Sequence, residues 1–369
     1  RLFPGDPYLH LTLARCERRA GKIAEARARL ENILEHAREP ALRAQILYQL
    51  GWLYDSAGEF AKAFAAYAEA KRLSSENARQ AAFDPDVPLT LINKAAALDL
   101  GQLPRVSAPK DARGRARDVA FLVGFPRSGT TLLHQVLDSH PGLVALEEKP
   151  VLPLTALRLA EWDLRYPEDL PALSSLQVEE LREDYFRLAH EYAAFHADSI
   201  LIDKLPLNLT HLPFILTLFP SAKIILALRH PWACVLSCFM HDFRLNNAMV
   251  HMVSLESIVA LYVKVMGLWR GFTAKRAFAA HAVRYEDVVA DLAGEARKIC
   301  AFLDVPFSPE MLKYDQHARA KGLINTPSYH QVVRPVYPDA VMRWRHYEKH
   351  LAPYAGALAP FTEAFGYTA

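Results

Sequence analysis

The segment Phe121–Leu132 reads FLVGFPRSGTTL, and its pattern determines how most of the chain is interpreted. The apolar run Val119–Val123 is typical of a buried strand, and the glycine-containing residues after it predict a tight loop. From Thr130 onward, the apolar residues recur at helical spacing. A strand, a loop and a helix in this order bring backbone N–H groups and a helix N-terminus around an anion. We therefore predict an anion-binding loop within an α/β domain.

The loop is close to the triphosphate-binding pattern G-x-x-x-x-G-K-[ST], with Gly124 and Gly129 at its two glycine positions. Thr130 stands where that pattern has lysine, and the cation of the loop is Arg127. Kinases and ATPases use this lysine on the β- and γ-phosphates. The departure favours another doubly anionic group, and a kinase-like small-molecule phosphotransferase stays as the alternative.

Length and composition narrow the class of protein. With 369 residues the chain exceeds one typical core, which predicts two domains. A net charge of +2 argues against a general nucleic-acid binder. Four cysteines without a C-x-x-C pair favour free thiols in a reducing, cytoplasmic setting, and we expect no membrane span. The sequence begins with Arg1, so an upstream segment and any targeting signal stay open.

Residues 1–83 are rich in Ala, Leu, Arg and Glu, and contain two similar stretches, Arg19–Ala26 and Ser56–Ala63. Their spacing is close to the tetratricopeptide period of about 34 residues. We predict an all-α region of tetratricopeptide-like repeats. It either offers a surface for a protein partner or for self-association, or forms a helical lid that only packs on the next domain.

Residues 84–117 are predicted to hold a connecting helix through Leu98 and a linker, and residues 118–369 to form the α/β domain. Its predicted strands are Val119–Val123, Leu143–Leu146, Ser199–Ile202, Lys223–Leu228 and Ala282–Arg284. Its predicted helices are Thr130–Leu137, Gln177–Phe195, Pro231–Met240, Leu255–Thr273 and Val288–Phe302. Strands separated by helices of this length imply right-handed crossovers and a central parallel sheet.

Ligands on such sheets bind beyond the carboxyl ends of the strands. Each predicted strand is followed at once by charged or hydrogen-bonding residues, namely Arg127 and Ser128, Glu147 and Glu148, Asp203 and Lys204, Arg229 and His230, and Tyr285 and Glu286. Ser237 lies about two turns into the helix that begins at Pro231, and with Arg229 it suits a second phosphate. The sequence thus predicts two anion sites on one edge. For Lys204, a simple ion pair with Asp203 is the alternative role.

These residues together resemble a known family. Pro126–Leu132 is similar to the 5′-phosphosulfate loop of sulfotransferases, and Arg229–Ser237 to their 3′-phosphate motif. Further segments look like those of bacterial tetratricopeptide-repeat sulfotransferases, which are related to tyrosylprotein sulfotransferases: Asp203–Asn208, Tyr285–Asp287, Gln331–Pro335 and Arg343–Tyr347. The resemblance covers about residue 116 to the C-terminus, and the repeats match the N-terminal part of the family.

The resemblance implies 3′-phosphoadenosine 5′-phosphosulfate (PAPS) as donor, adenosine 3′,5′-bisphosphate (PAP) as product, and no metal. It assigns the 5′-phosphosulfate to Arg127, Ser128, Gly129, Thr130 and Thr131. It assigns the 3′-phosphate to Arg229 and Ser237, and further nucleotide contacts to Tyr285, Ser328 and Arg343. Glu148 matches the base of the tyrosylprotein enzymes, and Lys204 matches their lysine near the bridging oxygen. Glu147 stays open as the base, because a one-residue slip would exchange the two acids.

The chemistry agrees with these residue types. Sulfuryl transfer, like phosphoryl transfer, needs positioning and cations more than covalent help. Glu148 is expected to take the acceptor proton, and Lys204 and Arg127 to stabilise the leaving phosphate. The acceptor hydroxyl stays open among a peptide tyrosine, a saccharide and a lipid head group. A repeat adaptor with a nucleotide-binding but inactive α/β domain is the rival from another class.

Overall fold

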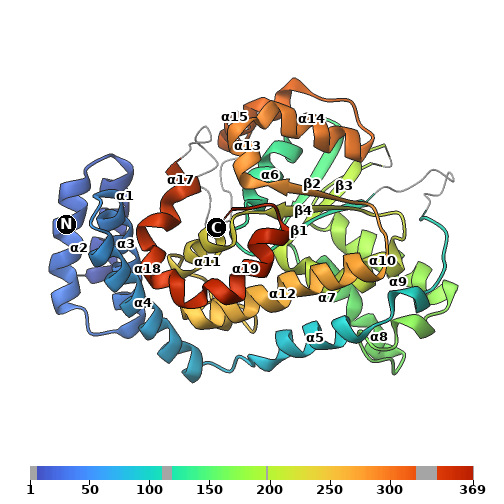
Figure 1. Cartoon of the computed structure of the whole chain (residues 1–369), viewed down its shortest axis with the longest axis horizontal. Coiled ribbons are helices and arrows are strands. Elements are labelled where there is room, and N and C mark those ends of the chain that lie inside the picture. The colour runs from blue at the N-terminus through green and yellow to red at the C-terminus, as the bar shows by residue number, and fades with distance from the viewer. Residues whose placement is uncertain (1–5, 110–118, 197, 321–338, 369) are drawn as a thin grey trace.

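The computed structural model describes residues 6–109, 119–196, 198–320 and 339–368. A parallel five-stranded sheet in the order β2-β3-β1-β4-β5 forms the centre of the α/β part (Figure 1). The strands are β1 (Val119–Gly124), β2 (Leu143–Glu147), β3 (Ile200–Lys204), β4 (Lys223–Leu228) and β5 (Ala280–Arg284). All five predicted strands are confirmed, with small changes at their ends.

Strand β1 lies in the middle of the sheet, because it pairs with β3 on one side and with β4 on the other. Its register sets Leu122 opposite Lys204 and Gly124 opposite Ala227. A Cβ added at Gly124 would lie 2.6 Å from the carbonyl oxygen of Ala227, so this strand end requires glycine. Because all the strands are parallel, their carboxyl ends meet along one edge of the sheet, as predicted.

Helices cover both faces of the sheet. Alternate residues of β1 enter different cores: Phe121 lies in the larger core cluster and Leu122 in the smaller one. The smaller core is covered by α6 (Thr130–Asp138), α13 (Tyr285–Ala290), α14 (Leu292–Leu303) and α15 (Tyr314–Ala320). The larger core is covered by α9 (Ser175–His190), α10 (Leu212–Leu218), α11 (Pro231–Phe239) and α12 (Leu255–Lys275).

One predicted helix, Val288–Phe302, is wrong, because two helices occupy this region. Helix α13 ends at Ala290, and α14 begins at Leu292. Asp291 separates them, since its backbone is not helical and its side chain accepts a 2.8 Å hydrogen bond from the N–H of Gly294. This is an ordinary N-cap, and the Asp at this position was the signal to use.

The N-terminal region is all-helical and packs as two successive helix pairs (Figure 1). Its helices are α1 (Pro7–Arg19), α2 (Ile23–His36), α3 (Pro40–Ser56) and α4 (Phe60–Gln80). A Cβ added at Gly51 of α3 would lie 2.8 Å from the ring of Tyr67 on α4, so the small residue lets these two helices approach closely. The tetratricopeptide assignment itself stays a prediction.

Helix α4 joins this region to the α/β part through a buried lysine. The Nζ of Lys71, whose residue is 3% exposed, donates hydrogen bonds to the carbonyls of His241 (2.8 Å) and Met252 (2.6 Å). Burial lowers the pKa of Lys71 to about 7. Because both acceptors flank the segment between α11 and α12, this contact fixes that segment against the helical region.

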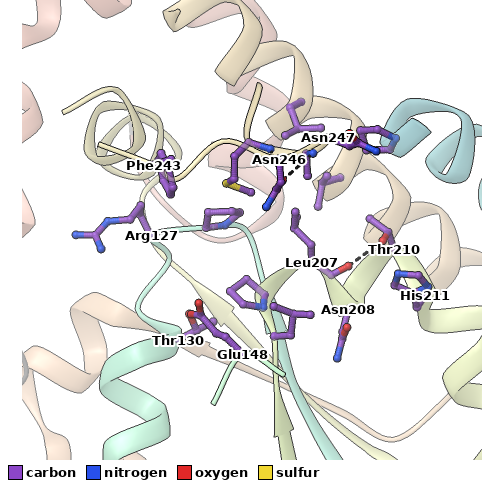
Figure 2. A pocket seen from close by; sticks show the side chains of 18 of the residues that line it. Arg127, Thr130, Glu148, Leu207, Asn208, Thr210, His211, Phe243, Asn246 and Asn247 are labelled. Atoms are coloured by element: carbon purple, nitrogen blue, oxygen red, sulfur yellow. Dashed lines mark hydrogen bonds between the residues drawn. The ribbon is translucent and has the colours of Figure 1, made fainter. Parts of the chain in front are cut away.

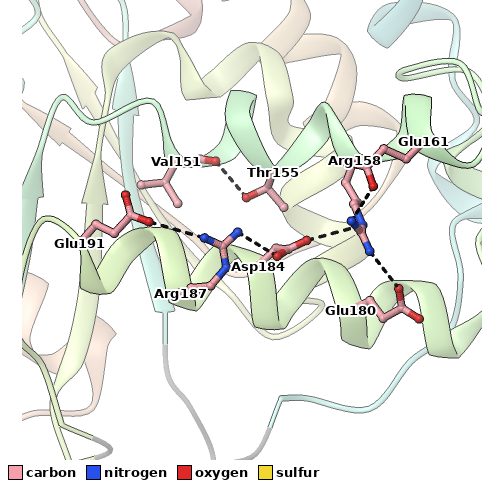
Figure 3. A network of polar contacts seen from close by, with 8 residues as sticks. All are labelled: Val151, Thr155, Arg158, Glu161, Glu180, Asp184, Arg187 and Glu191. Carbon is pink, nitrogen blue, oxygen red and sulfur yellow. Dashed lines mark hydrogen bonds and ion pairs between the residues drawn. The ribbon is translucent and has the colours of Figure 1, made fainter.

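Helix α5 (Asp86–Ala97) follows α4 where a connecting helix through Leu98 was predicted, and it packs on α12 (Figure 1). Helix α7 (Val151–Ala156) packs on α9, and α8 (Arg158–Glu161) is tied to α9 by ion pairs. Figure 3 shows this network, in which Arg158 and Arg187 share Asp184. These ion pairs hold α8 against α9, and α7 and α8 are the first helices after Glu148.

The C-terminal helices return to the N-terminal region. They are α17 (Asp339–Met342), α18 (Glu348–Leu351) and α19 (Ala355–Ala364). Short 3₁₀ helices occur along the described chain at Leu100–Gln102, Leu170–Ala172, Pro206–His211 (η3), Met249–Met252, Pro309–Lys313, Arg343–Tyr347 (η6) and Ala352–Tyr354. The ring of His350 stacks on Phe64 of α4, with centroids 3.5 Å apart. None of the helices in the described ranges is long and apolar enough to cross a membrane.

Candidate active site

The loop between β1 and α6 has a backbone that glycine and tight packing dictate. Gly129 has φ +104°, and Arg127 also lies in the left-handed region, at φ +69°. A Cβ added at Gly129 would lie 3.0 Å from the ring of Tyr285. The loop can therefore lead into α6 at Thr130 only with glycine at 129. The first N–H groups of α6 have no acceptor within the helix, which leaves them for an anion.

Hydroxyl side chains of this loop and of the start of α6 are buried. Ser128 is 3% exposed, and its Oγ has no hydrogen-bond partner among the described residues. Thr130 and Thr131 are also buried, at 3% and 8% exposure. Because a buried hydroxyl without a partner costs free energy, Ser128 fits a site that is completed by oxygen atoms of a ligand.

The two predicted anion sites lie next to each other. The Nε of Arg127 donates to the Oγ of Ser237 at 3.2 Å, and the Nη1 of Arg229 lies 3.5 Å from the carbonyl oxygen of Arg127. Arg229 also sits over the ring of Tyr285, 4.8 Å from its centroid. Burial lowers the pKa of Arg127, and the positive charge of Arg229 lowers it further. Two neighbouring guanidinium groups favour a bound anion between them.

Glu148 and Lys204 form an ion pair at the other flank of the loop. The Nζ of Lys204 lies 2.9 Å from Glu148 Oε1 and 3.7 Å from Glu147 Oε1. The Lys204 side chain is 0% exposed, whereas that of Glu148 is 37% exposed. Glu148 adopts φ +51°, and its N–H donates to the carbonyl of Lys204 at 2.8 Å. This turn directs Glu148, but not Glu147, into the cavity.

The alternative role of Lys204, an ion pair with Asp203, is wrong. Neighbouring residues of a strand point to opposite faces, and Asp203 accepts hydrogen bonds from the Tyr185 hydroxyl (3.0 Å) and the Asn208 amide (3.1 Å). Burial raises the pKa of Asp203 to about 7. Asp203 therefore holds η3 in place through Asn208. The sequence did not indicate Tyr185 as its other partner.

These groups surround a cavity of about 860 Å³ (Figure 2). Of the predicted site residues, the lining includes Arg127, Gly129, Thr130, Thr131, Glu148, Arg229 and Tyr285. Lys204, Ser128 and Ser237 lie behind this layer, two of them in contact with Glu148 and Arg127. The structure thus brings together ten of the predicted site residues, namely the seven that line the cavity and the three behind them. Glu147 is not one of these ten.

Two predicted nucleotide contacts are not in this group. Ser328 lies outside the described residues. Arg343 is on η6, and its Nη2 pairs with Asp55 of α3 at 2.6 Å, away from the cavity lining. Its observed contact is between the helical region and the C-terminal helices, because η6 packs on α4.

Part of the cavity wall was missed by sequence reasoning. Helix α5 and Phe83, which precedes it in the chain, contribute an apolar group: Phe83, Val87, Pro88, Leu91 and Ile92. The segment after α11 contributes Phe243, Arg244, Asn246, Asn247, Ala248 and Met249. Neither group carries a motif, and only the packing of distant parts of the chain brings them to the site.

The family model described as "Sulfotransferase family" matches residues 120–309, just over half of the chain. The chain belongs to the sulfotransferase family. The match includes β2 to β5 and all of β1 but its first residue, and of the site positions named above it leaves out Phe83, the α5 residues, Ser328 and Arg343. The resemblance stated from the motifs is therefore confirmed at the level of the family.

Relatives of this chain include protein-tyrosine sulfotransferase A of Caenorhabditis elegans, 28% identical over 63% of this chain and 63% of the nematode protein. An uncharacterized protein of Aquifex aeolicus is 26% identical over 63% of this chain and 31% of its own length. The chain thus spans less than two thirds of these relatives. A solved sulfotransferase domain from the curacin biosynthetic pathway is 20% identical, covering 69% of this chain and 99% of that domain, with a TM-score of 0.49.

Proposed function

We propose that this protein transfers a sulfuryl group from PAPS to an acceptor hydroxyl and releases PAP. The observation that carries the proposal is the joined pair of anion sites: Arg127 and the loop on one side, Arg229 and Ser237 on the other. A nucleotide with a 5′-phosphosulfate and a 3′-phosphate carries two anionic ends that match them. Ser128 would supply its buried hydroxyl, and Tyr285 an aromatic face, to the same ligand.

The groups around the cavity divide the reaction between them. PAPS supplies an activated sulfuryl group on a leaving phosphate. Glu148 accepts the proton of the acceptor hydroxyl, a role that is usually worth about 10²–10⁴-fold in rate. Lys204 and Arg127 stabilise the negative charge that develops on the bridging oxygen. Because Lys204 pairs with Glu148, it also holds that carboxyl group in position at the cavity.

Other parts of the proposal concern the setting of the reaction. A peptide tyrosine is one candidate acceptor, supported by the similarity to relatives named protein-tyrosine sulfotransferases. The helical region would bind a protein partner or a second copy through tetratricopeptide-like repeats. Cys234, Cys238 and Cys300 are buried free thiols, which support a reducing cytoplasm as the location.

Calorimetric titration with PAP tests the function. We expect tight 1:1 binding of PAP without metal, and much weaker binding of ATP, because ATP lacks the 3′-phosphate for Arg229 and Ser237. Arg229→Gln should weaken PAP binding about 10- to 100-fold, since a hydrogen bond to a charged group contributes about 1.5–3 kcal/mol. Equal binding of ATP, or ATP consumption with Mg²⁺, would instead support the kinase-like alternative.

A further inference from the structure

The order of the strands arranges the site groups in a row. Glu148 follows β2, Lys204 ends β3, the anion-binding loop follows β1, Arg229 follows β4 and Tyr285 follows β5. If the nucleotide lies over β1 with its 3′-phosphate at Arg229, which rests on the proposed function, the β4–β5 flank is occupied by the donor. The acceptor must then approach the sulfur of the donor from the β2–β3 flank, where Glu148 can take its proton.

The β2–β3 flank of the cavity is mainly apolar. After Lys204, η3 and the residue before it supply Leu205, Pro206 and Leu207, and α7 supplies Pro153. Helix η3 also supplies Asn208, Thr210 and His211, but each of these is hydrogen-bonded within the protein, to Asp203, to the Leu207 carbonyl and to Tyr166 respectively. Figure 2 shows Leu207 between Glu148 and the far wall of the cavity. Among the described lining residues, Glu148 is the sole carboxylate. This composition suits an uncharged, apolar body better than a polyhydroxylated one, which would leave hydroxyl groups without partners.

A further wall of the cavity comes from Phe83 and from α5, which packs against η3, and two large apolar side chains of this wall are exposed. Phe83 is 37% exposed and Val87 is 50% exposed, although both line the cavity. Large apolar side chains at the mouth of a cavity mark surfaces that a ligand covers. A second apolar layer, Pro88, Leu91 and Ile92, continues this wall inward.

The wall is held in place by polar contacts to the segment after α11. The N–H of Asp84 donates to Asn247 Oδ1 at 3.1 Å, and the Nε2 of His251 lies 2.8 Å from the carbonyl oxygen of Pro85. These contacts join the start of α5 to the segment that Lys71 anchors at His241 and Met252. The start of α5 is therefore fixed to this segment at the cavity.

We propose that Phe83 and helix α5 form the apolar wall of the acceptor subsite and select hydroxyl compounds with an apolar body, such as alkylphenols or long-chain alcohols. In the transfer, the acceptor oxygen forms a bond to sulfur while the bond from sulfur to the bridging oxygen breaks. The acceptor proton goes to Glu148, and PAP leaves with the electron pair of the broken bond. The apolar body stays between α5 and η3 during this step.

A series of 4-alkylphenols with increasing chain length tests this subsite, with PAPS as donor and kcat/KM as the readout. We expect kcat/KM to rise with each methylene by up to about fourfold until the wall is filled. Val87→Asn should flatten this rise and leave the affinity for PAP unchanged. Leu157→Asn is the matched control, because Leu157 is 66% exposed and lies outside the lining; it should keep the full rise.

Two results would overturn the assignment while leaving the proposed function intact. The first is a kcat/KM that does not change with alkyl length although PAP binds. The second is a higher kcat/KM for a saccharide or an acidic tyrosine peptide than for every alkylphenol. Absence of PAP binding by the wild-type chain would be a separate result, because it would overturn the proposed function and the acceptor assignment with it.

Discussion

Lys204 Nζ lies 2.9 Å from Glu148 Oε1, and this pair joins the ends of β2 and β3 at the cavity. The lysine is fully buried, while the carboxylate reaches solvent from a left-handed backbone turn. A buried cation thus holds an accessible carboxylate, and Glu147 lies farther from the same lysine. The geometry distinguishes two adjacent acids that the sequence could not.

Glu148→Gln should lower kcat by about 10²–10⁴-fold, because it removes the proton acceptor and keeps the shape of the side chain. The affinity for PAP should not change. Single-turnover transfer of labelled sulfate measures the effect. Glu147→Gln is the matched control and should stay within a few-fold of wild type. The reverse ranking of the two variants would make Glu147 the base.

Gly129→Ala should lower the affinity for PAP by about tenfold or more. The new Cβ would meet the ring of Tyr285 at 3.0 Å, and the residue would have to keep φ +104°. Gly58→Ala provides the control, because Gly58 has φ +75° but nothing within 4 Å of the added Cβ. The control should lose about 1 kcal/mol of stability and no affinity. Unchanged PAP titration for Gly129→Ala would show that the loop adapts.

Asp203 should make the protein less stable as pH rises. Burial raises its pKa to about 7 in the folded state, compared with about 3.9 in the unfolded chain. The folded state therefore binds more protons between these values, so this stabilisation is complete below pH 4 and is lost as pH rises through 7. Its full size is at most about 4 kcal/mol.

Asp203→Asn should remove this dependence, so the variant gains stability relative to wild type between pH 4.5 and 7.5. The amide can keep the contacts, because Asn208 Oδ1 is buried with no partner among the described residues and can accept from it. Urea denaturation at both pH values measures the difference. Asp304→Asn, at a side chain that is 83% exposed, should run parallel to wild type. Parallel curves for Asp203→Asn would refute the assignment.

Arg343→Met should reduce stability by about 1–3 kcal/mol, because it leaves Asp55 without the cation that lies 2.6 Å away. Asp55 also accepts a hydrogen bond from the Tyr347 hydroxyl, so the loss affects the contact between α3 and η6. We expect no change in PAP affinity. Thermal denaturation and PAP calorimetry on the same samples separate the two effects. A large loss of PAP affinity would support the nucleotide contact that the motif resemblance implied for Arg343.

The sheet and the anion-binding loop could be predicted because their signals are local. Apolar runs such as Lys223–Leu228 are bounded by charged residues, and the spacing of Gly124 and Gly129 dictates a loop geometry whatever the rest of the chain does. Arg127, Glu148, Lys204 and Arg229 all lie at strand ends, so the parallel topology alone brings them together. Strand ends are the part of a site that sequence reasoning reaches best.

The other parts of the site depend on contacts between distant segments. Val87 and Leu91 belong to a helix that looked like a connector, and its second role depends on packing against α12. Tyr185 reaches Asp203 of β3 only because α9 packs in the larger core. Arg343 was placed by resemblance to a motif, whereas its partner Asp55 lies near the other end of the chain. No periodicity or spacing encodes such pairs.

The buried amine of Lys71 limits where this chain can be divided. Its two carbonyl acceptors flank a segment that lines the cavity, and α5, whose start is hydrogen-bonded to this segment, lines it as well. A fragment cut at the start of β1 would keep the strand-end groups and lose both the α5 wall of the cavity and the Lys71 contact. Any fusion or domain exchange made with this chain must therefore include α4 and α5 along with the sheet.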